Sequence, residues 1–277
     1  MTAAARRDGL RAVAALALAA AVPALRAAPG GLPQAEDGDS SEAWERLRAQ
    51  LFGTRPLLTG AAVRLEAPRR AAYGASVPVK IVPALAQTPQ LWMKRLTLVV
   101  DHNPSPLAAV LELTPEIGWP EFETRLRVDQ YSHVRVVAEL SDGTLHTDSR
   151  YVKTSGGCSA PPNRDAPEHI GSTLVRLLEP ARVGVAGAAE VTVLHPNDTG
   201  FELDQRTMFY IPARFVRTLA VSYAGRPLFD AELDFSISEN PSWRFRFVPQ
   251  GPGELRAEAQ DSQDARFSGR LAVEPQA

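Results

Sequence analysis

Short apolar segments, several of which alternate apolar with polar residues, recur over most of this sequence, and turn residues separate them. Alternation with a period of two residues is typical of strands that bury one face. The 277 residues include 23 prolines, which argue against long helices because proline interrupts the hydrogen bonds of a helix interior. The clearest strand runs from Trp243 to Phe247, with aromatic residues on one face and arginines on the other. We therefore expect an all-β protein.

The expected strands form two groups along the chain. Ser141-Asp142-Gly143-Thr144 separates two of them and predicts a hairpin. Pro78 favours a sheet edge for its segment, because proline cannot donate a hydrogen bond to a ladder. Groups of about seven short strands without intervening helices are typical of immunoglobulin-like antiparallel sandwiches, so we expect two of these. The segments are 62–66, 77–82, 96–100, 107–113, 121–128, 133–140 and 145–152, then 173–178, 189–194, 215–223, 227–233, 243–248, 254–259 and 265–273.

One short helix is expected before the first strand. Ser41 is a candidate N-cap, and an apolar stripe with helical spacing runs from Trp44 to Phe52 before Gly53. We interpret this stripe as a surface that packs against a sheet.

Residues 1–27 have the features of an export signal. Arg6, Arg7 and Arg11 precede a short apolar run from Ala12 to Ala21, which is too short to span a bilayer as a stable helix. The Arg6-Arg7 pair leaves the twin-arginine and general export routes both open. We expect an exported, periplasmic protein without a membrane span.

A change of composition separates the two groups of strands. Residues 155–167 are polar, small or proline, and they predict a boundary. The expected organisation is a signal peptide over 1–27, a sandwich over 41–153, a linker over 154–167 and a second sandwich over 168–277. Because the linker is short, we expect the two sandwiches to pack against each other.

Cys158 is the only cysteine, and it lies in this linker. An exported structural cysteine normally has a disulfide partner, and this one has none. Ser155, Gly156, Gly157 and Ser159 flank it, which predicts a mobile, exposed thiol with an ordinary pKa of about 8.5. Such a thiol suits a protein that carries a cargo. A surface cysteine without a role, in a two-sandwich scaffold or adhesion protein, remains the alternative.

The charged residues and histidines point to no other chemistry. The net charge of −2 gives no basic surface for nucleic acid. A thiol enzyme would need a base beside Cys158, for which His169 and His195 are the candidates, and we interpret them as a linker residue and a turn residue. No phosphate-binding glycine loop or nucleophile-elbow serine is present. The other three histidines, His102, His133 and His146, show no metal-ligand spacing.

Several motifs, in this order along the chain, resemble a fused SoxY–SoxZ protein, the sulfur-compound carrier of the periplasmic Sox sulfur-oxidation system. Residues 44–53 and Gly156-Gly157-Cys158 resemble SoxY. The segments 195–200, 237–241 and 243–249 resemble SoxZ. The resemblance covers nearly the whole mature chain, and fused proteins of this kind form a subgroup associated with quinoprotein dehydrogenases.

The resemblance implies a function for the lone thiol. In SoxY the cysteine lies on a glycine-rich arm and holds sulfur intermediates covalently, so Cys158 is the expected carrier residue of a protein that is not an enzyme. Ser155, Gly156, Gly157 and Ser159 would flank it on a swinging arm. The implied partners are periplasmic enzymes of sulfur oxidation or enzymes linked to a quinoprotein dehydrogenase. No cofactor is expected, and a single polypeptide should suffice as the functional unit.

The sequence departs from SoxY after the thiol. SoxY ends with glycines on both sides of its cysteine, whereas here Ser159-Ala160-Pro161-Pro162 follows and the chain continues. An arm that is tethered at both ends has a shorter reach. This departure leaves the cargo open between thiosulfate and another thiol-reactive compound.

Overall fold

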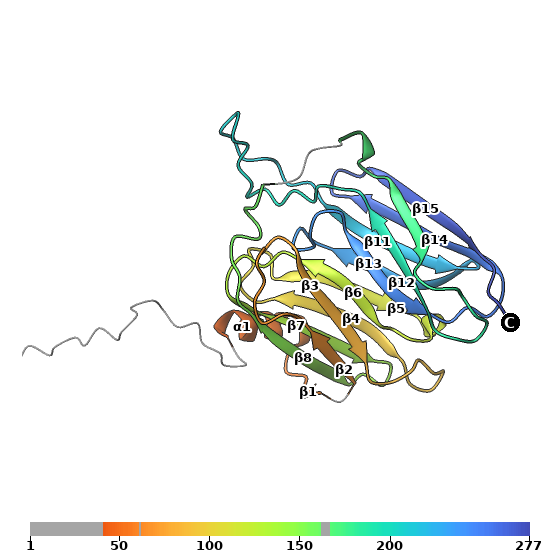
Figure 1. Ribbon diagram of the computed structural model, residues 1–277. Helices are drawn as coiled ribbons and strands as arrows, with labels where there is room; N and C mark the ends of the chain where they lie inside the picture. The colour runs from red at the N-terminus through yellow and green to blue at the C-terminus, as the bar shows by residue number, and fades with distance from the viewer. Residues whose placement is uncertain (1–40, 61, 162–166) are drawn as a thin grey trace, which may run out of the picture. The chain divides into compact units, whose positions relative to one another are not determined.

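The computed structural model describes residues 41–60, 62–161 and 167–277 (Figure 1). The predicted signal peptide and residues 162–166 of the predicted linker lie outside the described residues. Among those described, no helix is long and apolar enough to cross a membrane.

The described chain is built from two β-sheets and one short α-helix, as the alternation pattern predicted (Figure 1). One sheet has nine strands in the order β1 (Leu57–Thr59), β8 (Leu145–Val152), β7 (Ser132–Leu140), β4 (Met93–Val100), β5 (Leu107–Leu113), β12 (Arg226–Leu233), β11 (Val216–Tyr223), β14 (Gly253–Asp261) and β15 (Arg266–Val273). The other has six, in the order β2 (Val63–Glu66), β3 (Val77–Pro83), β6 (Phe122–Leu126), β13 (Ser242–Phe247), β10 (Gly187–Val193) and β9 (Thr173–Leu177).

Both sheets continue across the boundary that the sequence predicts. In the larger sheet β5 pairs with β12 in antiparallel register, from Leu113 opposite Phe229 to Ala109 opposite Leu233. In the smaller sheet β6 pairs with β13 at Phe122 opposite Phe245. The two sandwiches are therefore joined edge to edge by backbone hydrogen bonds, and each half covers a strand edge of the other.

The side chains between the sheets form one core that spans both halves. At its centre Phe122 packs edge-on against Phe229, with ring centroids 5.2 Å apart, and against Trp243 at 6.3 Å. Phe229 in turn packs edge-on against Phe245 at 5.2 Å. These are favourable geometries for aromatic pairs, so the interface between the halves has the character of a protein interior.

Helix α1 (Glu42–Phe52) confirms the predicted helix and its role. The Ser41 side chain accepts a hydrogen bond from the Trp44 backbone at 3.0 Å, and Gly53 ends the helix with a φ of 61°. Trp44 and Phe52 pack on the outer face of the nine-stranded sheet against Val99, Val137 and Leu145. Guanidinium stacking adds to this contact, because Arg135 lies 4.7 Å from the centroid of the Trp44 ring.

Two strand-level details differ from the sequence expectations. Pro78 does not lie on an edge strand, because β3 pairs with β2 on one side and β6 on the other. Pro78 lies opposite Arg125 of β6, beyond the part of β3 that β2 covers, so no ladder bond from its nitrogen is lost. The short strand β1, which the pattern did not predict, pairs in parallel with β8.

Candidate functional site

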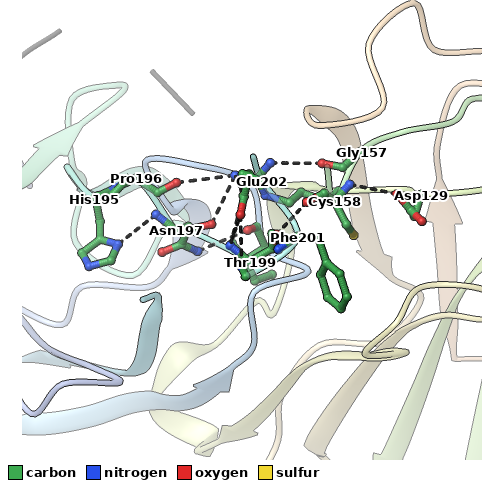
Figure 2. A network of polar contacts seen from close by, with 12 residues as sticks. Asp129, Gly157, Cys158, His195, Pro196, Asn197, Thr199, Phe201 and Glu202 are labelled. Carbon is green, nitrogen blue, oxygen red and sulfur yellow. Dashed lines mark hydrogen bonds and ion pairs between the residues drawn. The ribbon is translucent and has the colours of Figure 1, made fainter. Parts of the chain in front are cut away.

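Cys158 is buried, which corrects the expectation of an exposed thiol on a mobile strip. Its residue exposure is only 1 %, although Ser155, Gly156 and Ser159 beside it are exposed. The local sequence offers no apolar cover, so the burial comes from residues far away along the chain. The cysteine segment is docked onto the body of the protein (Figure 2).

Three backbone groups of the cysteine segment donate hydrogen bonds to the loop that follows β6. Gly156 N donates to the Asp129 carbonyl at 2.8 Å, and Gly157 N donates to the Val128 carbonyl at 3.2 Å. Cys158 N donates to the Asp129 carboxylate at 3.1 Å. Asp129 is itself positioned by Asn103, whose side-chain oxygen accepts from Asp129 N at 2.9 Å. The segment therefore follows a defined path on the first half.

The second half holds the same segment through Thr199 and through a buried arginine. The Thr199 hydroxyl donates to the Cys158 carbonyl at 2.6 Å. Arg127, which is 1 % exposed, donates to the Gly157 carbonyl at 3.0 Å and to the Asn197 carbonyl at 3.2 Å. Its guanidinium lies 3.9 Å from the fully buried carboxylate of Glu202. Figure 2 shows these contacts as one network, in which the thiol segment is shared by the two halves.

Close packing, and not a need for mobility, explains why residue 157 beside the thiol is a glycine. A Cβ added at Gly157 would lie 2.5 Å from the Val128 carbonyl oxygen and closer still to that of Gly74. A Cβ at Gly74 would lie 2.6 Å from the Ser155 carbonyl oxygen. Two backbones thus pass each other at a distance that no side chain allows.

Replacing Gly157 with alanine should therefore displace the docked segment. We expect a loss of about 1–3 kcal/mol in the free energy of unfolding, which is the usual cost of overpacking, and faster labelling of Cys158. Urea unfolding and thiol labelling of the variant would measure both. Gly251→Ala is the matched control, because a Cβ there meets no atom within 4 Å. Unchanged stability and labelling in Gly157→Ala would contradict this packing argument.

Burial also changes the acidity of the thiol, contrary to the ordinary pKa expected from the sequence. Desolvation raises the pKa of Cys158 to about 12, and the carboxylates of Asp129, Glu202 and Asp234 act in the same direction. Arg127 acts in the opposite direction and is outweighed. The docked thiol is therefore protonated and weakly nucleophilic near neutral pH.

The raised pKa of Cys158 predicts how the stability of the protein depends on pH. Because folding raises the pKa of Cys158, the folded chain keeps a proton that the unfolded chain loses near its ordinary pKa of about 9. The contribution of this thiol to stability should be complete below pH 9 and be lost as the pH rises from about 9 towards 12. Urea unfolding between these pH values should show the decline in the wild type and a shallower decline in Cys158→Ala. Parallel curves for the two proteins would contradict it.

Two family models match the chain, and the boundary between their matches follows Cys158. The model for the sulfur oxidation protein SoxY matches residues 48–158, and the model for the sulphur oxidation protein SoxZ matches residues 175–272. The chain is a fused SoxY–SoxZ protein. This confirms the family that the motifs indicated, and Cys158 is the last residue of the SoxY match. The association with a quinoprotein dehydrogenase stays a prediction.

Solved structures are similar to parts of the chain. The sulfur carrier protein SoxY from Chlorobium limicola f thiosulfatophilum has 26 % identity over 40 % of this chain and 91 % of its own, with a TM-score of 0.35. A superoxide reductase (neelaredoxin) from Ignicoccus hospitalis has 11 % identity over 39 % of this chain and 90 % of its own, with a TM-score of 0.31. A search of curated proteins gave no match.

The SoxY and SoxZ parts together form a pocket beside the thiol. Its volume is about 530 Å³, within the range of small-molecule sites. The lining comes from loops of both parts, including the long connection between β10 and β11 that projects from the sheets in Figure 1. The lining residues are Pro104, Asp129, Cys158, Ser159, Gly200, Phe201 and Tyr210.

The two histidines considered as bases for a thiol enzyme make their contacts elsewhere. His195 Nδ1 accepts from Asn197 N at 3.0 Å, and its Nε2 lies 3.6 Å from Asp261, so the ring organises the turn that leads to Thr199. Desolvation lowers the pKa of His195. His169 is exposed and lies 3.7 Å from Glu168. In the part of the chain that the structure describes, no group of three or more metal-ligating side chains occurs.

Sequence reasoning missed the residues that hold the thiol segment. Arg127 and Asp129 follow a strand and have no distinctive spacing, and Glu202 lies outside the motifs. Thr199 lies within the SoxZ-like segment 195–200, which was the only available signal. The burial of Arg127 depends on how the strands pair, and the sequence alone does not specify this pairing.

Proposed function

We propose that this chain is a periplasmic carrier that holds a sulfur-containing intermediate covalently on Cys158 and presents it to partner enzymes. The observation that carries this proposal is the position of Cys158. It is the only cysteine, it ends the SoxY match, and it lines a pocket that both parts of the fusion form. The chain itself would catalyse no reaction.

Thiol chemistry supports this role. A thiolate attacks a sulfur electrophile and later leaves again as a good leaving group, so one residue is able to load and release cargo. In the docked conformation the raised pKa and the burial of Cys158 protect it from oxidation, to which an exposed thiol of an exported protein is liable. Loading therefore requires the cysteine segment to leave its site.

The contacts of the segment are consistent with reversible release. Hydrogen bonds donated by Gly156, Gly157 and Cys158, and others donated by Thr199 and Arg127, hold its backbone. Each contributes on the order of 1 kcal/mol net, so a partner that contacts the segment is able to replace them. The partners we propose are periplasmic sulfur-oxidation enzymes or enzymes linked to a quinoprotein dehydrogenase. The export features of residues 1–27 support the location.

The intact mass of the protein purified from its native periplasm tests the carrier function. Cells should be broken in the presence of an alkylating reagent, which blocks exchange of thiols during purification. We expect a fraction of the wild-type chain to carry a sulfur-containing adduct and Cys158→Ser to carry none. An adduct that persists in Cys158→Ser, or its complete absence from the wild type during growth on sulfur compounds, would leave a scaffold or adhesion role as the better account.

A further inference from the structure

A groove on the outer face of the six-stranded sheet is separate from the thiol site. Its volume is about 720 Å³, within the range of small-molecule sites. No described residue lines both this groove and the pocket beside Cys158. Residues of β3 and β6 from the SoxY part and of β9, β10 and β13 from the SoxZ part line it. The groove therefore exists only because the two parts are joined in one sheet.

A row of alternating charges crosses this face. The register of the sheet places each carboxylate opposite a cation on a neighbouring strand, and opposite charges in such positions stabilise a sheet. From β2 to β9 the members of the row are Glu66, Lys80, Glu123, Arg244, Glu190 and Arg176. Carboxylates and cations are equal in number, so the row is neutral. Pairing between strands accounts for these side chains.

Arg125 adds a positive charge that the row does not balance. It lies on β6 two residues after Glu123, so the two side chains share a face of the strand. It is exposed, and within the described residues its side chain forms no ion pair and no hydrogen bond. A guanidinium binds carboxylates and other oxyanions through paired hydrogen bonds. A cation of this kind that lines the groove favours an anionic ligand.

Glu190 holds two further arginines in place on the SoxZ side of the groove. It is 5 % exposed, and its carboxylate accepts hydrogen bonds from Arg176 Nη2 at 2.6 Å and from Arg244 Nε. Burial acts to raise the pKa of Glu190, but the hydrogen bonds from Arg244 and Arg176 lower it, so the carboxylate is ionised. A guanidinium has more N–H donors than these bonds use. Arg244 therefore keeps donors for a ligand.

Other lining residues suit the body of an organic molecule. The Thr192 hydroxyl donates to Ser242 Oγ at 3.1 Å, and both residues line the groove. Leu174 on β9 is 54 % exposed and offers apolar surface. Strands β13 and β9 are separated only by β10, so they lie about 10 Å apart. A ligand of about this length would reach from Arg244 to Leu174.

We propose that this groove binds a small organic anion, with its carboxylate or sulfonate group on Arg125 and Arg244 and its apolar body over Leu174. The two arginines come from neighbouring strands, β6 of the SoxY part and β13 of the SoxZ part. Covering Leu174 removes apolar surface from water, which adds to the attraction between the charges. The inference does not depend on the carrier function of Cys158.

Two naphthalene probes of similar shape test the charge argument. Naphthoate carries a carboxylate, whereas naphthamide is neutral. Isothermal titration calorimetry of the full chain should show saturable binding of naphthoate, with an affinity at least about tenfold higher than that of naphthamide. Added salt should weaken the binding of naphthoate and leave that of naphthamide unchanged. Cys158→Ser should bind both probes like the wild type, because Cys158 does not line the groove.

A pair of arginine variants locates the anion. Arg125→Gln should weaken the binding of naphthoate about fivefold or more, because it removes the unpaired cation, and it should leave the binding of naphthamide unchanged. Arg270→Gln is the matched control, because Arg270 is an exposed arginine of β15 that does not line the groove. Its affinities should equal those of the wild type.

A pair of leucine variants locates the apolar body. Leu174→Ser should weaken the binding of both probes about threefold, because the naphthalene ring loses its apolar contact. Leu178→Ser is the matched control, because Leu178 is 42 % exposed and does not line the groove. It should leave both affinities unchanged.

The remaining outcomes would overturn the inference. If naphthoate does not saturate the protein at millimolar concentration, or binds no better than naphthamide, the groove is not an anion site. Equal losses in Arg125→Gln and Arg270→Gln would mean that naphthoate is attracted to positive charge in general. A peptide of glutamates presents carboxylates without an aromatic body, so it should bind more weakly than naphthoate. If it binds more tightly, the groove receives an acidic segment of a partner protein, and a small ligand is the wrong assignment.

Discussion

Replacing Arg127 with methionine should both destabilise the protein and release its thiol. Arg127 and Glu202 are buried opposite charges 3.9 Å apart, and methionine would leave the carboxylate without its cationic partner. Removing one member of a buried ion pair typically costs about 3–5 kcal/mol. The same change removes the hydrogen bond to the Gly157 carbonyl, so labelling of Cys158 should be faster. Urea unfolding and thiol labelling would measure the two effects.

Two further variants make the Arg127 prediction specific. Arg125→Met changes an exposed arginine two residues earlier, and it should change stability by no more than about 0.5 kcal/mol. Adding Glu202→Gln to Arg127→Met removes the unpaired charge, so it should restore part of the lost stability. A loss below about 1 kcal/mol in Arg127→Met would show that this network does not hold the segment.

Replacing Phe122 with alanine should destabilise both halves of the molecule together. Phe122 is 1 % exposed and packs against Phe229 and Trp243, which belong to the second half. Truncating a buried phenylalanine typically costs about 3–5 kcal/mol. Because the sheets and the core cross the boundary, we expect hydrogen exchange to become faster by a similar factor in β4 and in β11. Mass-detected hydrogen exchange would measure both strands.

The matched control for Phe122 is an aromatic residue without buried contacts. Phe209→Ala truncates an exposed side chain, and it should leave exchange in both strands unchanged. If Phe122→Ala accelerates exchange in β4 alone, the two halves unfold independently. The shared core would then contribute little to joining them.

The sequence was sufficient for most of the local structure. Residues 41–53 predicted a helix with its cap, since Ser41 and Gly53 form hydrogen bonds with neighbouring backbone groups. The apolar stripe from Trp44 to Phe52 indicated which face of the helix is buried. Alternation predicted strands such as 62–66 and 243–248 for a similar reason, because alternate side chains of a half-buried strand are apolar. The order of the SoxY-like and SoxZ-like motifs was enough to indicate the family.

Only the tertiary structure decided how the strands pair and where the thiol lies. The pairing of β5 with β12 joins residues more than a hundred positions apart, and alternation does not specify the partner of a strand. The flanks of Cys158 are small and polar, which locally favours exposure. Val128, Asp129 and Thr199 come from two other parts of the chain and hold the cysteine segment in the buried position. This burial raises the pKa of the thiol. Burial is set by contacts in space, and for this cysteine those contacts leave no pattern in the neighbouring sequence.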